Sequence, residues 1–200
     1  VDAFFIAGFL STKDLGIYSV ATQINGIFLQ IPTLANSLLI PFFVTLQTEN
    51  RTNLLNKYFE HTFPAITLIG GLGAMFAAFA FYFLIPIVFG QEFSASVLPL
   101  WILLTASAIS LPALFGYAAL TNSTSATYIA TISAVVSSFV NITANFLLIP
   151  KYGMKGCAWA TIITFFVSIL IYAIFLVRKT HIPLSWVFLA ILPSLFGTII

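Results

Sequence analysis

Charged residues are scarce in this sequence, and their scarcity excludes most classes of protein. They make up 6% of the 200 residues, as seven Lys or Arg and five Asp or Glu. A soluble domain carries about 25–35% of such residues on its surface, and a disordered chain is polar and poor in aromatics. Here 60% of the residues are hydrophobic, 22 are Phe, and the mean hydropathy is +1.10. The sequence therefore predicts an integral membrane protein.

Residues with catalytic or metal-binding chemistry are also few. One cysteine, Cys157, allows no internal disulfide, and two histidines, His61 and His181, show no metal-ligand spacing. No Gly-x-Ser-x-Gly elbow or phosphate-cradling glycine loop occurs. The Lys and Arg residues are dispersed, which argues against a nucleic-acid partner. We therefore expect no catalytic residue, no metal, no cofactor and no enzyme activity.

Methionine is absent from the start of the chain. The sequence begins at Val1, its only methionines are Met75 and Met154, and it ends in the apolar run 187–200. We expect an internal piece of a longer protein.

Long charge-free stretches predict membrane-spanning helices, because about 20 apolar residues are needed to cross the hydrocarbon core. No short alternating segments typical of a membrane β-barrel are visible. The predicted fold is an all-α polytopic membrane protein. Its complete spans are 16–40, 63–88, 97–120, 127–149 and 157–177, and its two partial spans are 1–10 and 186–200.

Two features of the segment 16–61 predict irregular helices. The apolar character of the first complete span continues to Leu46, and Pro32 and Pro41 lie inside it, so kinks or breaks are expected at both prolines. Residues 47–61 carry an apolar stripe, which predicts an amphipathic helix lying at the membrane interface.

The Lys and Arg counts of alternate loops differ only slightly. The side with four is placed in the cytoplasm by the positive-inside rule. One side has Lys13, Lys151 and Lys155, and the other has Arg51, Lys57, Arg178 and Lys179.

Neutral polar residues form one-sided stripes on two predicted spans. Because an unpaired amide in lipid costs several kcal/mol, both stripes should face protein or water. They line either a cavity that contacts sugar hydroxyls or a set of interhelical hydrogen bonds, and the sequence leaves both open. The candidates are Tyr18, Thr22, Gln23, Asn25 and Asn36 on the first span, and Ser133, Ser137, Asn141 and Asn145 on the fourth.

One charged residue lies within a predicted span. Asp2 falls in the partial span 1–10, whereas the complete spans contain no Lys, Arg, Asp or Glu. Intramembrane acids often mark ion or proton pathways. Asp2 is therefore either an ion or proton site or a residue at the membrane edge.

The most specific motif covers residues 141–161. Asn141 and Asn145 precede Pro150, which is expected to end a helix, and Gly153 and Gly156 allow a tight reversal. This segment resembles the Asn-x3-Asn-x3-(Ile)-Pro-x-(Tyr/Phe)-Gly-x-x-Gly-Ala-x-x-Ala-Thr signature of bacterial polysaccharide flippases. These belong to the multidrug/oligosaccharidyl-lipid/polysaccharide exporter superfamily. Further similarities lie at residues 14–21, at Pro41 and at residues 89–93, and Cys157 replaces the usual Ala.

The resemblance implies half of a two-lobe transporter with 12–14 helices. Residues 1–180 would form the C-terminal six-helix lobe with a truncated first helix, and residues 181–200 would start a further helix. The implied substrate is an undecaprenyl-pyrophosphate-linked oligosaccharide, such as an O-antigen, capsule or exopolysaccharide unit, flipped by alternating access across the bacterial inner membrane. Implied partners are membrane lipids, this substrate and the polysaccharide polymerase machinery.

One departure from that expectation concerns the pyrophosphate. The resemblance implies Lys or Arg in the cavity, and because the complete spans have none, the other lobe would have to supply them. Two alternatives stay open. A cation-coupled multidrug exporter of the same superfamily would use Asp2, and a membrane-embedded transferase would need a general base on a loop, with only the isolated Glu49, Glu60 and Glu92 available.

Overall fold

The computed structural model describes residues 2–124 and 126–180 of the chain, and these form helices without any strand. Two segments are π-helical (η1 and η3) and one is a 3-10 helix (η2). In chain order the elements are α1 (Asp2–Phe9), α2 (Thr12–Thr48), α3 (Thr52–Lys57), η1 (Tyr58–Thr62), α4 (Phe63–Val88), η2 (Gln91–Ser96), α5 (Val97–Pro112), η3 (Ala113–Tyr117), α6 (Ala118–Ser123), α7 (Tyr128–Tyr152) and α8 (Met154–Thr180).

Five helical segments are long and apolar enough to cross a membrane. They confirm the five complete spans expected from the sequence, and the chain is an all-α polytopic membrane protein. Each is longer at one or both ends than the sequence suggested. The segments are Thr12–Thr48, Thr52–Val88, Gln91–Ser123, Tyr128–Tyr152 and Met154–Phe175.

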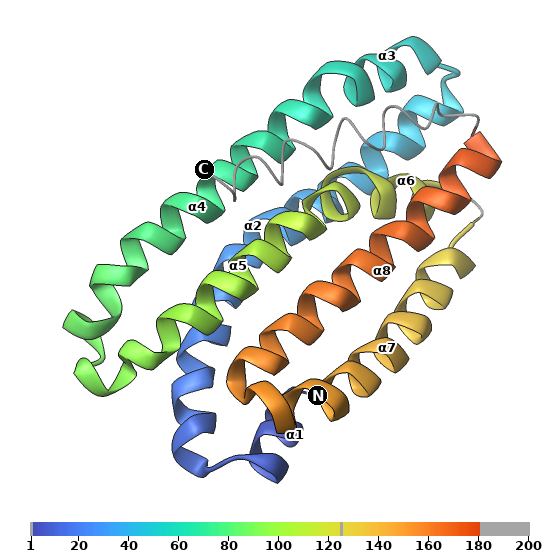
Figure 1. Cartoon of the computed structure of the whole chain (residues 1–200). Helices are drawn as coiled ribbons and strands as arrows, with labels where there is room; N and C mark the ends of the chain where they lie inside the picture. The colour runs from blue at the N-terminus through green and yellow to red at the C-terminus, as the bar shows by residue number, and fades with distance from the viewer. Residues whose placement is uncertain (1, 125, 181–200) are drawn as a thin grey trace.

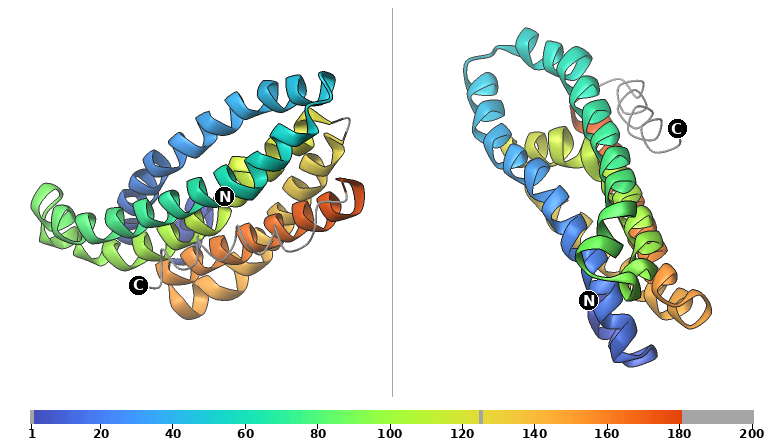
Figure 2. Two further views of the ribbon diagram at one scale, coloured as in Figure 1. Left: turned by 90° about the horizontal axis from the view of Figure 1, so that it is seen from above. Right: turned by 90° about the vertical axis from the view of Figure 1, so that its left-hand side faces the viewer.

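The helices form a bundle around α5. Figure 1 shows α4, α5, α8 and α7 side by side, with α2 behind them. α5 packs against α2, α4 and α8, and most of its residues are buried. Figure 2 shows α2 running apart from α4 with α5 beside both, so a large part of α2 remains exposed. Many of the exposed large residues are apolar, such as Ile31 and Phe76, as expected of a surface that meets lipid.

Local signals explain where the helices begin and turn. Ser11 caps α2 through a capping box with Asp14, in which the Ser11 hydroxyl accepts from the Asp14 N–H at 3.1 Å. Gly90 with φ +97° precedes η2, and Gly153 with φ +59° separates α7 from α8. Both are left-handed backbone conformations that favour glycine.

The turns place the charged residues at opposite ends of the bundle. Lys13, Lys151 and Lys155 lie at the end where α1 meets α2 and α7 meets α8, whereas Arg51 and Lys57 lie at the other end, beside α3 (Figure 1). This grouping agrees with the two sides expected from the sequence. Which end is cytoplasmic stays a prediction.

α2 continues through Pro32 and Pro41 without interruption, so of the kinks or breaks expected at these prolines no break occurs. Nearby hydroxyls donate to backbone carbonyls in the same turns, with Thr33 Oγ1 to Leu29 O at 2.7 Å and Thr45 Oγ1 to Pro41 O at 3.1 Å. Side-chain bonds of this kind help membrane helices to tolerate proline.

Of the amphipathic helix predicted over 47–61, residues 52–62 are helical, and its place at the membrane interface stays a prediction. α2 extends to Thr48, and α3, η1 and α4 follow one another without a break, as one membrane-spanning segment. The apolar residues of this stretch pack inward instead, since Tyr58 and Phe59 join Phe43 and Phe63 in a buried aromatic cluster. The Tyr58 hydroxyl donates to the carbonyl of Phe115 in η3 at 2.6 Å, which ties the two π-helical segments together.

Pro150 does not end its helix, contrary to the sequence-based expectation. α7 runs two residues further, to Tyr152, and ends where the Gly153 N–H donates to Ile149 O at 2.8 Å. The reversal is made at Gly153, which has a positive φ. Two sequence predictions, His181 and the partial span 186–200, lie outside the described residues, as does the proposed boundary segment 181–200.

Candidate functional site

A polar cluster joins α1, α7 and α8 inside the bundle. The Asn145 side-chain amide donates to Asp2 Oδ1 at 3.0 Å and to Asn141 Oδ1 at 3.1 Å. Thr161 Oγ1 lies 3.5 Å from Asp2 Oδ2 and 3.2 Å from the Cys157 carbonyl. Asn145 is fully buried, and Asp2 is half-buried. The structure thus places Asp2 against two of the asparagines that the sequence singled out.

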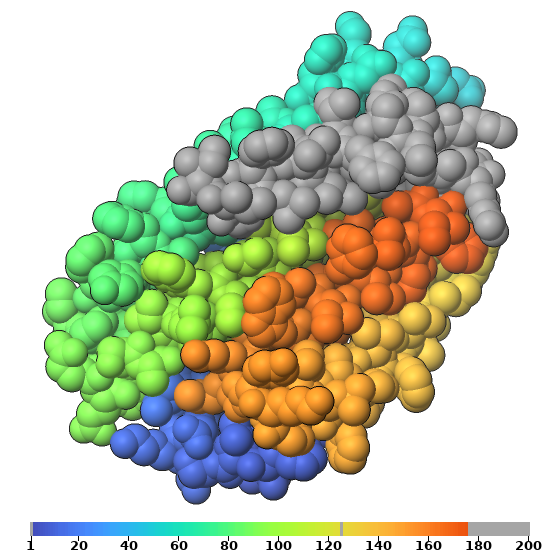
Figure 3. All heavy atoms as spheres, in the orientation of Figure 1, coloured from blue at the N-terminus to red at the C-terminus, as the bar shows by residue number. Residues whose placement is uncertain are grey.

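The helices hold this cluster by local features of the sequence. Asn141 and Asn145 are four residues apart, so they share one face of α7. Thr161 comes into reach because α7 and α8 pack closely along their lengths, where Gly156, Ala158 and Ala160 are buried. Figure 3 shows α1 at the lower end of this face, beside the start of α8, which brings Asp2 to the cluster.

The cluster has hydrogen-bonding capacity that the described residues do not use. Asn145 Oδ1 is buried without a hydrogen-bond partner among them, and the buried hydroxyl of Tyr18 lies beside Cys157 and Thr161. Buried polar atoms are normally paired with protein or with bound water or ions. The available ligands are oxygens, which suit a proton or a small hard cation. Within the described residues, no group of three or more His, Cys, Asp or Glu is assembled for a metal.

The other predicted residues of α2 have more ordinary roles. Asn25 Oδ1 accepts from Ser107 Oγ on α5 at 2.7 Å, which is an interhelical bond. Thr22 Oγ1 donates to the carbonyl of Ser19 within its own helix at 2.9 Å. Gln23 is exposed on the outer face of α2, and Asn36 has a buried side-chain oxygen without a partner among the described residues.

The predicted polar residues of α7 do not share one hydrogen-bonding partner. Ser133 Oγ lies 2.9 Å from Ser168 Oγ on α8, as an interhelical bond, and Ser137 Oγ is buried without a partner in the described part of the chain. Asn141 and Asn145 belong to the Asp2 cluster. Only these two of the nine predicted cavity residues are therefore hydrogen-bonded into one site.

Two participants were missed by the sequence reasoning. Thr161 closes the Asp2 cluster, and its signal was its place at the end of the motif that begins at Asn141. Ser107 pairs with Asn25 but sits in a span rich in small residues, where nothing in the sequence distinguishes it.

The comparison with known families gives one match. Residues 1–98 match the family model described as a polysaccharide biosynthesis protein. This match confirms the resemblance drawn from the sequence and supports a role in polysaccharide biosynthesis or export. It includes Asp2 and the α2 stripe, whereas the motif at 141–161 lies outside it. No curated protein and no solved structure matches the chain.

Proposed function

We propose that this multi-pass membrane protein, whose first 98 residues match a polysaccharide biosynthesis family, is a flippase. Its substrate would be an oligosaccharide unit linked to undecaprenyl pyrophosphate, carried across the bacterial cytoplasmic membrane by alternating access. The observation that carries this proposal is the Asp2–Asn145 cluster inside the bundle of a chain with that match. An acid in such a position is typical of transporters.

The cluster has a role in this mechanism that follows from its chemistry. The oxygen atoms of Asp2, Asn141, Asn145 and Thr161 are ligands that suit a small hard cation. A small cation bound between the Asp2 carboxylate and the unused Asn145 Oδ1 would add a contact between α1 and α7, and its release would remove that contact. A ligand that favours one arrangement of helices shifts the population towards it, so the cluster would couple an ion gradient to the change of access.

The outer face of α2 fits an amphiphilic substrate. Exposed polar residues alternate there with exposed apolar ones, which suits a molecule with both a sugar and a polyprenyl chain. Gln23, Gln30, Thr33 and Ser37 supply hydrogen-bonding groups, and Ile27, Ile31, Leu34 and Leu38 supply apolar surface. We propose this face as the part of the described chain that contacts the substrate.

The experiment compares a bacterial strain lacking the protein with the same strain carrying it. Surface polysaccharide is measured by gel staining, and the lipid-linked precursor is quantified by mass spectrometry of lipid extracts. We expect the deletion to lose surface polymer and to accumulate precursor. Normal polymer with normal precursor, in a strain without a redundant transporter, would overturn the proposal.

A second candidate function, a cation-coupled drug exporter, is favoured by the same Asp2 cluster. Drug susceptibility of the deletion strain distinguishes the two, since only an exporter would leave the strain more sensitive while the polymer is unchanged. We further propose that the protein is not an enzyme. Transfer of labelled sugar by the purified protein would contradict that.

A further inference from the structure

A cavity of about 600 Å³ lies at the end of the bundle that carries Lys13, Lys151 and Lys155, and no residue of the Asp2 cluster lines it. Three turns of the chain meet there: the α1–α2 turn, the α4–α5 connection through η2, and the α7–α8 turn. Its walls include Leu10, Val97, Leu98 and Met154. None of the nine polar residues that the sequence predicted as cavity candidates lines it. This volume lies within the range of about 300–1,000 Å³ that small-molecule sites occupy.

Aromatic side chains in the wall of this cavity indicate its depth in the membrane. Tyr82, Trp101 and Tyr152 line it and are each about half exposed. The Trp101 indole N–H donates to the Ala78 carbonyl at 2.9 Å, which fixes the ring against α4 beside Tyr82. Tyr and Trp gather where headgroups meet the hydrocarbon core. The cavity therefore lies where a lipid headgroup would reach it.

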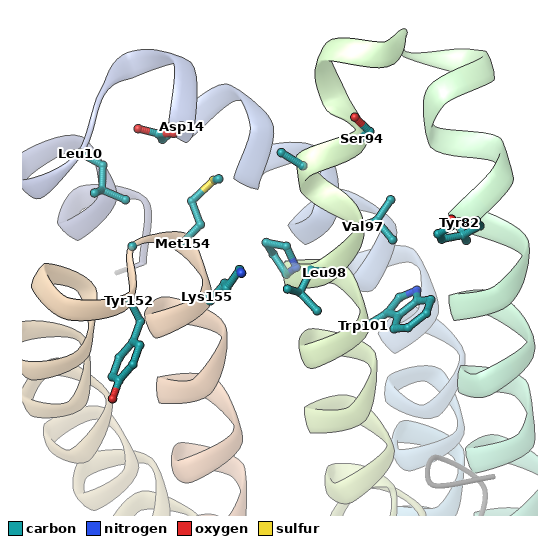
Figure 4. Close-up of a pocket in the computed structure, with 13 residues that line it drawn as sticks. Leu10, Asp14, Tyr82, Ser94, Val97, Leu98, Trp101, Tyr152, Met154 and Lys155 are labelled. Carbon is teal, nitrogen blue, oxygen red and sulfur yellow. The ribbon is translucent and has the colours of Figure 1, made fainter.

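Two opposite charges line the cavity without pairing with each other. Lys155 and Asp14 both contribute to its wall, but within the described residues the one ion pair closer than 4.0 Å is Arg51–Glu49. Figure 4 shows Lys155 extending from the first turn of α8 toward Leu98 on α5, while Asp14 lies on the first turn of α2. The Ser11 hydroxyl and N–H both donate to Asp14 Oδ2, which leaves Oδ1 available.

Other charges at this end of the bundle stand outside the cavity. Lys13 adjoins Asp14 in sequence, and Lys151 and Glu92 lie in the neighbouring turns, yet none of the three lines the cavity. Among the described residues, the charge that lines the cavity is thus one cation and one anion.

We propose that this cavity binds the headgroup of a zwitterionic phosphoethanolamine lipid, with the phosphate at Lys155 and the ammonium group at Asp14. The acyl chains would lie along Leu98, Trp101 and Tyr82. A purely anionic lipid would satisfy Lys155 but bring negative charge to Asp14, and a pyrophosphate would do so more strongly. A phosphocholine headgroup has the same charges, but its quaternary nitrogen has no N–H to donate to the carboxylate.

The test is native mass spectrometry of the purified protein in detergent, titrated with defined lipids. The series is phosphatidylethanolamine, its N-monomethyl and N,N-dimethyl derivatives, phosphatidylcholine and phosphatidylglycerol. We expect phosphatidylethanolamine to bind about tenfold more tightly than phosphatidylcholine or phosphatidylglycerol, because it alone makes both charge-assisted bonds. Affinity should fall stepwise as N–H groups are replaced by methyl groups. This lipid series needs no change in the protein.

Substitutions of Lys155 and Asp14 then test which part of the headgroup each residue binds. Lys155→Ala should lose about tenfold in affinity, and Lys155→Arg should retain most of it. Asp14→Asn should flatten the methylation series and remove the preference over phosphatidylglycerol. Because Asp14 also caps α2, circular dichroism of this variant checks its helix content. The matched controls are Lys151→Ala and Glu92→Gln, which change the same charges at the same end of the bundle outside the cavity.

Three results would overturn the proposal. The first is equal binding of phosphatidylethanolamine and phosphatidylglycerol by the unaltered protein. The second is a methylation series that is already flat in the unaltered protein. The third is an equal loss in Lys151→Ala and Lys155→Ala, which would indicate a general attraction of the basic end for phosphates.

Discussion

Two buried asparagines illustrate how similar sequence features lead to different roles. Asn25 on α2 accepts a hydrogen bond from Ser107, and both residues are neutral and buried. Asn145 on α7 donates to Asp2 and to Asn141 and keeps its own oxygen unpaired among the described residues. The first pair forms a self-sufficient link between helices. The second faces a carboxylate and has acceptor capacity left, so it is the one suited to bind and release a ligand.

The largest effect expected from this comparison is on transport. Replacing Asp2 by Asn, or Asn145 by Leu, should reduce export of the lipid-linked precursor by about 100-fold, near the upper end of the range that coupling energies between sites produce. Asn25→Leu is the matched change in the other region, and it should leave export within about twofold if the protein remains inserted. The measurement is the ratio of surface polymer to accumulated precursor, normalised to the amount of protein in the membrane.

Equal losses of export in the two regions would contradict the distinction drawn between Asn25 and Asn145. An equal loss in Asn25→Leu and Asn145→Leu, at equal amounts of membrane-inserted protein, would mean that both asparagines contact the substrate. The two polar stripes would then form one cavity, as the first interpretation of the sequence allowed.

An effect of intermediate size is expected on stability, from the glycine that lets α8 approach α7. A Cβ added to Gly156 would collide with the backbone carbonyl of Leu148. Because a backbone atom cannot move aside as a flexible side chain can, Gly156→Ala should destabilise the protein by about 2 kcal/mol, as overpacking does. Gly26→Ala on α2 is the control, since a Cβ there meets nothing within 4 Å. It should leave the stability unchanged or raise it by up to about 1 kcal/mol.

Thermal unfolding of the purified variants in detergent measures this difference. The Asp2 cluster depends on the same close packing, because Thr161 reaches Asp2 from α8. Gly156→Ala should therefore also reduce export, whereas Gly26→Ala should not. A melting temperature of Gly156→Ala equal to that of the unaltered protein would show that the α7–α8 turn adjusts without strain.

The sequence predicted the elements of this molecule better than their contacts. The charge-free stretches located all five described spans, and the scarcity of charge singled out Asp2. Periodicity also put Asn141 and Asn145 on one face of α7, but it does not say which helix that face meets. The partners Ser107 and Thr161 therefore emerged only from the packing of α5 and α8.

The errors share one physical cause. Pro32, Pro41 and Pro150 are tolerated inside helices here, and the stretch 47–61 is absorbed into α2 and into the helix that continues as α4. In each case packing and local hydrogen bonds outweighed the intrinsic tendency of the residues to break or end a helix. Local propensity is weakest as a guide where neighbouring helices supply such compensation.

The smallest predicted effect concerns the link between α2 and α5. In a double-mutant cycle of Asn25→Ala and Ser107→Ala, the coupling free energy should be about 0.6 kcal/mol, the average for interhelical hydrogen bonds in membranes. The matched cycle of Asn145→Ala and Asp2→Ala should give a larger value, because a hydrogen bond to a charged group is worth about 1.5–3 kcal/mol. Unfolding in detergent provides both values under the same conditions. Equal coupling in the two cycles would mean that the Asp2–Asn145 bond is no stronger than a neutral interhelical bond, and the contrast between the two asparagines would then fail.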